Sequence, residues 1–174
     1  AFFEGVIEGI DEAIEEYKEL GVEVIVKKVQ GYNEEVHLGA IEELKRSGCA
    51  ALCLATIDTP KVADKINECQ KLGIKIILVN SDVHNTKKIC YVGSDYIKAG
   101  KTCAGLLSLI SKQPKLDILV VTGSKLMCGH RQRIEGFKEE LEALKVDFNI
   151  CAQIESNDSD ITAQIETSKY LKEH

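Results

Sequence analysis

The stretch DTPKVADKINECQKLGIKIILV, residues 58–79, contains one helix and one strand together with the signals that separate them. Asp58 or Thr59 is placed to cap the helix, and Pro60 suits the first helical turn, where no backbone N–H is needed. Gly73 ends the helix, and the run IKIILV that follows is continuously apolar. A continuous apolar run is typical of a strand covered on both faces, as in a parallel sheet.

Similar units precede this stretch at near-equal spacing. Apolar residues recur at three- and four-residue steps over 3–17, which predicts an amphipathic helix ending near Gly21, and VEVIVKKV (22–29) is predicted to be a strand. A second helix is expected over 33–47, with Gly48 at its end, followed by the buried strand CAALCLAT (49–56). The repeated order of helix, glycine and strand predicts an α/β fold with a parallel sheet flanked by helices.

The alternation is interrupted at 80–95 by a polar, turn-rich segment that contains the short strand ICYVGSD (89–95). Helices are then expected over 96–111, 129–144 and 160–172, and strands over 115–123 and 146–154. We therefore predict an N-terminal lobe over 1–80 and a C-terminal lobe over 81–174, with a crossover near 80–95. Because the chain opens on a helix with no strand before it, we interpret it as an excerpt of a longer chain, truncated at both ends.

Composition narrows the function classes. The 174 residues are 44% hydrophobic and 29% charged, with a net charge of −6 and no basic block, so the chain alone is a poor nucleic-acid binder. No apolar run approaches the roughly 18 residues of a membrane helix, and we expect no membrane association. We interpret the cysteines as small buried hydrophobes in a reducing cytoplasm, with a reactive or metal-binding cysteine as the alternative. The seven are Cys49, Cys53, Cys69, Cys90, Cys103, Cys128 and Cys151.

Candidate binding residues lie where strands end, because ligands of open parallel sheets collect at the carboxyl ends of the strands. Asn80, Asp82 and Arg133 are planar, hydrogen-bonding groups suited to sugar hydroxyls, and Phe2 and Phe3 could cover the apolar face of a sugar. The alternatives are turn or cap roles for Asn80 and Asp82 and core packing for the phenylalanines. For Arg131 and Arg133 the alternative is solvation or pairing with neighbours such as Glu135 and Glu139.

Enzyme motifs are lacking: there is no GxSxG, no phosphate-binding loop and no GxGxxG after a strand. Cys128 and His130 are near neighbours without a carboxylate, and we expect them to pack in their loop. His37 and His84 are expected to be exposed. We predict no catalytic residues, no cofactor and no metal site.

The stretch GHRQRIEGF (129–137) places basic residues at the positive end of a helix, which costs roughly 0.3–1 kcal/mol each. Arg131 and Arg133 lie two positions apart, so they cannot share one helix face. One is expected to point into the space between the lobes, where a ligand or a carboxylate would use its donors.

Three stretches together resemble a known family: FFEGVIEGI (2–10), VGSDYIKAG (92–100) and RQRIEGF (131–137). They are similar to the ligand-binding domain of lactose-repressor (LacI) family transcription regulators and to the related type I periplasmic sugar-binding proteins. The resemblance implies two lobes that close on a small ligand, usually a sugar. It implies that Phe2 and Phe3 sandwich the sugar, that Asn80 and Ser81 hold positions of ligand-binding residues, and that Arg133 is the cleft arginine.

The resemblance also has departures. Relatives often have Asp and Arg where this chain has Asn80 and Ser81, so Asp82 would take over part of that role. They also have a strand before the paired phenylalanines and further ligand-binding strands beyond the last helix. The implied function is the effector-binding domain of a cytoplasmic LacI-type regulator, a homodimer that meets DNA through a helix-turn-helix outside this chain. The alternative is a periplasmic sugar-binding protein of a transport system.

Overall fold

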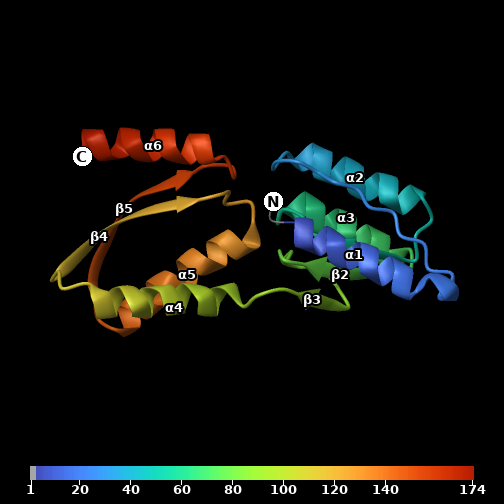
Figure 1. Cartoon of the computed structure of the whole chain (residues 1–174), viewed down its shortest axis with the longest axis horizontal. Helices are drawn as coiled ribbons and strands as arrows, with labels where there is room; N and C mark the ends of the chain where they lie inside the picture. The colour runs from blue at the N-terminus through green and yellow to red at the C-terminus, as the bar shows by residue number, and fades with distance from the viewer. Residues whose placement is uncertain (1–2) are drawn as a thin grey trace.

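Two separate parallel sheets organise the computed structural model, which describes residues 3–174 (Figure 1). The first sheet has the order β1-β2-β3, and the second pairs β4 with β5. The strands are β1 (Ala51–Leu54), β2 (Lys75–Val79), β3 (Cys90–Val92), β4 (Lys115–Thr122) and β5 (Asp147–Glu155). The helices are α1 (Glu4–Glu16), the 3-10 turn η1 (Lys18–Leu20), α2 (Glu34–Arg46), α3 (Pro60–Lys71), α4 (Tyr96–Ile110), α5 (Cys128–Ala143) and α6 (Asp160–Glu173).

The predicted α/β class, with parallel sheets flanked by helices, is confirmed. We call residues 3–92 the first half of the chain and residues 93–174 the second half, because β3 pairs with β2 and α4 follows directly. Within the described residues, no helix is both long enough and apolar enough to cross a bilayer.

Local signals explain most element ends. Gly21, Gly48 and Gly73 adopt the left-handed φ values 72°, 76° and 90°, a conformation that glycine reaches without steric cost. At the start of α3, Thr59 is the cap, and its side-chain oxygen accepts a hydrogen bond from the Val62 N–H. Because Thr59 caps this helix, the carboxylate of Asp58 is left to make contacts elsewhere.

The core of the first half lies between one face of the sheet and the helices α2 and α3. Inward residues of β1 and β2 alternate with exposed ones, so only one face of this sheet is buried. The predicted burial of both faces is therefore wrong for this sheet, because no described helix covers the second face. The core comprises Ile41, Leu52, Leu54, Ile57, Val62, Ala63, Ile66, Cys69, Ile74, Ile76, Leu78 and Val83.

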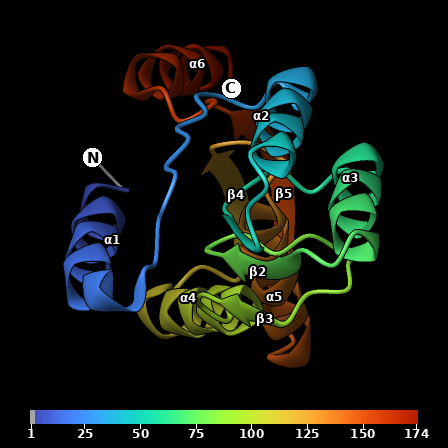
Figure 2. The ribbon, with the colours of Figure 1, turned by 90° about the vertical axis from the view of Figure 1, so that its right-hand side faces the viewer.

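The predicted strand over 22–29 does not form. This segment joins no ladder in the described part of the chain, and Val22, Val24, Ile25 and Val26 are exposed. None of the residues of α1 is buried, and Figure 2 shows α1 set apart from the β1–β3 sheet. A strand needs a neighbour for its backbone hydrogen bonds, and the local apolar pattern alone does not supply one.

In the second half, α4 and α5 approach closely through two glycines. A Cβ on Gly100 would lie 2.0 Å from the carbonyl oxygen of Arg133, and a Cβ on Gly136 would lie 2.1 Å from that of Ile97. Only glycine therefore permits this contact, and the contact fixes where Arg133 emerges from α5. Helix α6 lies along β5 at the opposite side of the sheet (Figure 1).

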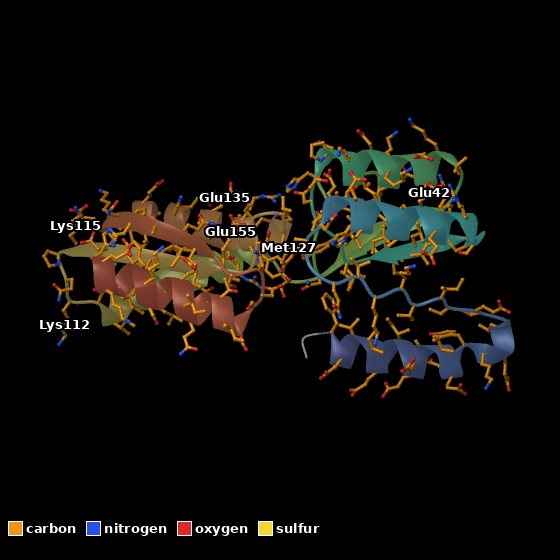
Figure 3. The ribbon with its side chains drawn as sticks, turned by 90° about the horizontal axis from the view of Figure 1, so that it is seen from above. Glu42, Lys112, Lys115, Met127, Glu135 and Glu155 are labelled. Atoms are coloured by element: carbon orange, nitrogen blue, oxygen red, sulfur yellow. The ribbon has the colours of Figure 1, made fainter. Side chains whose placement is uncertain are left out.

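The loop between β4 and α5 joins the two halves. Leu126 and Met127 pack against the core of the first half, and Figure 3 shows Met127 between the two groups of elements. The backbone N–H of Asp58 donates to the Leu126 carbonyl at 2.8 Å. A second contact joins the two halves, in which the Tyr32 hydroxyl donates to the Asp158 carboxylate.

Candidate functional site

Three side chains meet where β2 ends and the helices of the second half begin. They are Asn80, directly after β2, Tyr96, the first residue of α4, and Arg133, in the second turn of α5. We call them the Asn80–Tyr96–Arg133 cluster. Two of them were expected from the sequence to bind ligand, and Tyr96 was not.

Asn80 is held in an unusual backbone conformation. Its φ is +61°, a left-handed value that Asn tolerates better than most residues. Its N–H donates to the Val92 carbonyl at 2.8 Å, and its own carbonyl accepts a hydrogen bond from the Tyr91 hydroxyl at 3.0 Å. Burial raises the pKa of Tyr91 to about 12, so this hydroxyl keeps its proton at neutral pH. These bonds fix the backbone of Asn80 at the end of β2.

Tyr96 links Asn80 to Arg133. Its hydroxyl donates to Asn80 Oδ1 at 2.7 Å, and the central carbon of the Arg133 guanidinium lies 4.2 Å from the centre of its ring. The ring fits against α5 because position 129 is glycine: a Cβ there would lie 2.6 Å from Tyr96. The stacked guanidinium keeps its N–H donors at its edge, which is the geometry that hydroxyl pairs require. The signal that could have found Tyr96 is its place at a strand-to-helix corner, beside Asn80.

The two residues after Asn80 have different roles. Asp82 Oδ1 accepts a hydrogen bond from the Val83 N–H at 2.8 Å and pairs with Lys88 at 2.7 Å, which agrees with the alternative turn role. Ser81 is 1% exposed, and its Oγ is the buried side-chain polar atom for which the described residues supply no hydrogen-bond partner. A buried hydroxyl without a partner costs about 1–3 kcal/mol, so this corner is imperfectly satisfied as it stands.

The two phenylalanines are placed differently. Phe2 lies outside the described residues. Phe3 precedes α1 and is 42% exposed. It therefore stands on the helix that Figure 2 shows apart from the first sheet, rather than on a corner of either sheet.

Arg131, which was expected to point away if Arg133 enters the cleft, instead crosses the junction. Its guanidinium pairs with the Asp58 carboxylate and donates to the Lys125 carbonyl at 2.6 Å. No side chain caps the start of α5, and Asp58 supplies the negative charge that this helix end lacks. The basic helix start therefore forms an ion pair between the halves.

Asp58 also binds His84. Its Oδ2 lies 2.7 Å from His84 Nδ1, and its Oδ1 accepts the His84 backbone N–H at 2.9 Å. Burial acts to raise the pKa of Asp58, but the hydrogen bonds from His84 and the charge of Arg131 outweigh it and hold this pKa below its usual value. His84 is exposed, as expected, although both its imidazole and its backbone N–H contact Asp58.

His37 and His130 are structural. The prediction that His37 is exposed is wrong: it is buried, with Nδ1 2.9 Å from Thr56 Oγ1 and Nε2 3.1 Å from the Gly31 carbonyl. His130 Nδ1 accepts the Ser124 N–H at 3.0 Å, and burial lowers its pKa. This contact fits the expected packing of His130 within its loop.

A groove of about 680 Å³ runs between α4, α5 and β4. Its wall is mostly apolar, with Leu106, Leu107, Ile110 and Phe137 among the lining residues, and Arg133 lies among them as well. An apolar wall of this kind offers few partners for the hydroxyls of a sugar. We therefore place the polar site at the cluster rather than in the groove.

An α/β chain with parallel sheets and a polar cluster at its strand ends has the architecture of a periplasmic-binding-protein-like ligand-binding domain. The chain belongs to the periplasmic binding protein domain family, whose model matches residues 1–174. It is accordingly a binding protein rather than an enzyme. Among proteins of curated function, none matches the sequence significantly.

Solved structures show the same fold. The Caulobacter myo-inositol binding protein, bound to myo-inositol, is 19% identical with a TM-score of 0.80, and the match covers 97% of this chain and 56% of that one. GanP, a glucose-galactose binding protein from Geobacillus stearothermophilus, is 23% identical with a TM-score of 0.79, covering 91% and 56%. A periplasmic sugar binding protein of an ABC sugar transporter from Legionella pneumophila is 19% identical with a TM-score of 0.76, covering 95% and 60%. The chain thus spans somewhat more than half the length of these proteins.

The prediction of a cytoplasmic protein is wrong. The family and the similar transporter proteins point to a location outside the cytoplasm. The prediction depended on the odd number of cysteines and on their place in apolar runs, and all seven are free. A free cysteine packs as a small apolar side chain in any compartment, so the count carried little information. Four of them are exposed rather than buried: Cys53, Cys90, Cys103 and Cys151.

Proposed function

We propose that this chain is part of an extracytoplasmic binding protein that delivers a sugar or sugar-like polyol to a transport system. The family match over the whole chain supports this proposal, as does the repeated occurrence of sugar-transporter binding proteins among the similar structures. The LacI-type regulator predicted first has no support of its own from these comparisons. Its homodimer and its DNA partner stay predictions.

The observation that carries the proposal is the Asn80–Tyr96–Arg133 cluster. An amide, a phenol and a guanidinium converge at one corner, and each is a planar or rigid group that can hold neighbouring hydroxyls. The guanidinium is pre-positioned by the Tyr96 ring, which reduces the entropy lost when a ligand binds. Neutral polyols fit this set because none of the three groups is an anion and only one carries charge.

The remaining predicted site residues join the proposal with narrower roles. Ser81 Oγ would gain a partner from a ligand hydroxyl or a bound water at this corner. Asp82, already bonded to Lys88, would contribute by holding the loop. Phe2 and Phe3 would cover the apolar face of the sugar, as the family resemblance implies.

We also propose that the two halves act as lobes, with the division predicted from the sequence at residues 1–80 and 81–174. The pairing of β3 with β2 favours a crossover between Val92 and Tyr96, inside the predicted range of 80–95. A ligand held by Asn80 from one half and by Arg133 from the other would favour the closed arrangement of the two.

A thermal-shift screen tests the proposal. The purified protein is heated with monosaccharides, including galactose, arabinose and rhamnose, with myo-inositol, and with amino acids as the non-sugar control. A ligand present at about 100 times its dissociation constant adds roughly 2.7 kcal/mol, a shift of several degrees for a chain of this size. A shift with a polyol and none with the amino acids supports a sugar-binding protein. A shift with the amino acids alone contradicts it.

A further inference from the structure

Asp58, His84 and Cys128 bring three different ligand atoms to one point of the junction. The carboxylate oxygen, the imidazole nitrogen and the thiol sulfur all lie within 4.8 Å of one another. Asp58 follows β1, His84 lies in the loop after β2, and Cys128 begins α5, so the set draws on both halves. We propose that these three residues bind a divalent transition-metal ion of the zinc class and that the ion ties the two halves together.

The geometry is close to that of a tetrahedral site. His84 Nδ1 lies 2.7 Å from Asp58 Oδ2 and 3.9 Å from Cys128 Sγ. Metal bonds of about 2.0–2.3 Å at tetrahedral angles separate ligand atoms by roughly 3.2–3.8 Å. The nitrogen and sulfur are thus nearly in place, the nitrogen and oxygen must separate by about half an ångström, and the oxygen and sulfur, which lie within 4.8 Å of each other, must approach by up to about one ångström. Rotation of the exposed His84 side chain provides the separation of nitrogen and oxygen.

The donor set selects the class of ion. One sulfur, one imidazole nitrogen and one carboxylate oxygen suit zinc and its neighbours, whereas magnesium and calcium prefer oxygen ligands alone. Three protein ligands leave a fourth position for water. The exposed edge at His84 gives the ion a path to the buried Cys128 thiol, whose proton leaves when the metal binds.

Two neighbours of the Asp58 carboxylate affect metal binding: the His84 backbone orients the carboxylate, and Arg131 competes with the metal ion for it. The backbone N–H of His84 holds Asp58 Oδ1 at 2.9 Å, so Oδ2 stays directed toward the other two ligand atoms. The Arg131 guanidinium pairs with the same Oδ2 and competes with a cation there. Arg131→Gln is therefore expected to raise metal affinity by at least severalfold, an effect that an adventitious surface site would not show.

Cobalt is the practical probe, because Co²⁺ takes the same geometry as Zn²⁺ and a thiolate bond to cobalt gives a strong near-ultraviolet absorption. The reduced protein, freed of metal by a chelator, is titrated with Co²⁺ and then with Zn²⁺. We expect saturation at about one equivalent, a thiolate-to-cobalt band, and displacement by zinc. Cys128→Ser removes the band, while Cys103→Ser, at an exposed cysteine of α4, leaves it unchanged.

A second variant covers the case in which Cys128→Ser does not fold. His84→Gln changes an exposed side chain, so the metal-free protein keeps its fold, and cobalt affinity should fall at least about tenfold. No band in the wild type, or a band that Cys128→Ser and His84→Gln leave unchanged, overturns the proposal. This inference does not rest on the proposed sugar function, and sugar binding is measured separately.

Discussion

Asp58→Asn is the substitution that most directly perturbs the junction between the halves. The carboxylate is only 8% exposed and receives three contacts, from the Arg131 guanidinium, from His84 Nδ1 at 2.7 Å and from the His84 backbone N–H at 2.9 Å. Asparagine keeps the shape but removes the charge and replaces one acceptor with a donor. The three donors then face a neutral or mismatched partner.

The expected loss in the free energy of unfolding of Asp58→Asn follows from these three contacts. A hydrogen bond to a charged group contributes about 1.5–3 kcal/mol and one to a neutral group about 0.5–1.5. Arg131 is 40% exposed and His84 58% exposed, so solvent screens a large part of the difference. We expect a total loss of about 2 kcal/mol, which corresponds to a fall in melting temperature of roughly 4–8 °C for a chain of this length.

The assay is thermal unfolding of wild type, Asp58→Asn and the control Asp64→Asn, an exposed carboxylate on α3, with chelator present. The pKa of Asp58 is lowered in the folded state, so its contribution is present above the unfolded value near 4 and is lost as the pH falls below it. The difference between wild type and Asp58→Asn should therefore be present at neutral pH and vanish in acid. Equal melting temperatures for the two variants at neutral pH would refute the reasoning.

Three further predictions concern the second half. Gly136→Ala places a methyl group 2.1 Å from a carbonyl oxygen of the facing helix, so chemical denaturation should show a loss of about 1–3 kcal/mol in the free energy of unfolding. Gly105→Ala is the control on α4, since a Cβ there would have no atom within 4 Å, and it should stabilise the protein by about 0.5–1 kcal/mol. Equal effects of Gly136→Ala and Gly105→Ala on stability would contradict the close contact of α4 and α5. Tyr96→Phe removes a 2.7 Å hydrogen bond but keeps the ring, so melting should reveal a loss of about 1 kcal/mol, and no loss would mean that this bond does not form. Cys128 is buried, and that burial raises its pKa to about 11. In metal-free protein at pH 8, iodoacetamide should therefore label the exposed Cys103 before Cys128, as mass spectrometry can follow. Equally fast labelling of Cys128 would place its thiol at the surface.

Local signals predicted the elements that depend on their own residues. The glycines after three helices, the cap at Thr59 and the apolar runs of β1, β2 and β4 were all readable in the sequence. The structure of segment 22–29 was not readable in the sequence. Its apolar pattern is typical of a strand, but a strand needs a neighbouring strand for its hydrogen bonds, and the local pattern does not supply one. The exposed face of the first sheet was not readable either, because its burial depends on a covering element that the strand sequence does not specify.

The candidate site was predicted only in part, because its contacts join distant parts of the chain. Asn80 and Arg133 were recognised as planar polar groups at strand ends, whereas the role of Tyr96 depends on packing against Gly129. The partner of Arg131 is Asp58, 73 residues away, and the sequence contains nothing that pairs them. The sequence places Cys128 near His130, whereas its spatial neighbour is His84.

The central claim is that Arg133 binds the sugar at the Asn80–Tyr96–Arg133 cluster, and isothermal titration of the best sugar into Arg133→Ala tests it most directly. The matched control is Arg46→Ala, an arginine on α2 that is 77% exposed and lies outside the cluster. We predict that Arg133→Ala weakens binding at least about 30-fold, or about 2 kcal/mol, because sugar hydroxyls are then buried without partners. An affinity for Arg133→Ala equal to that of Arg46→Ala would contradict the account.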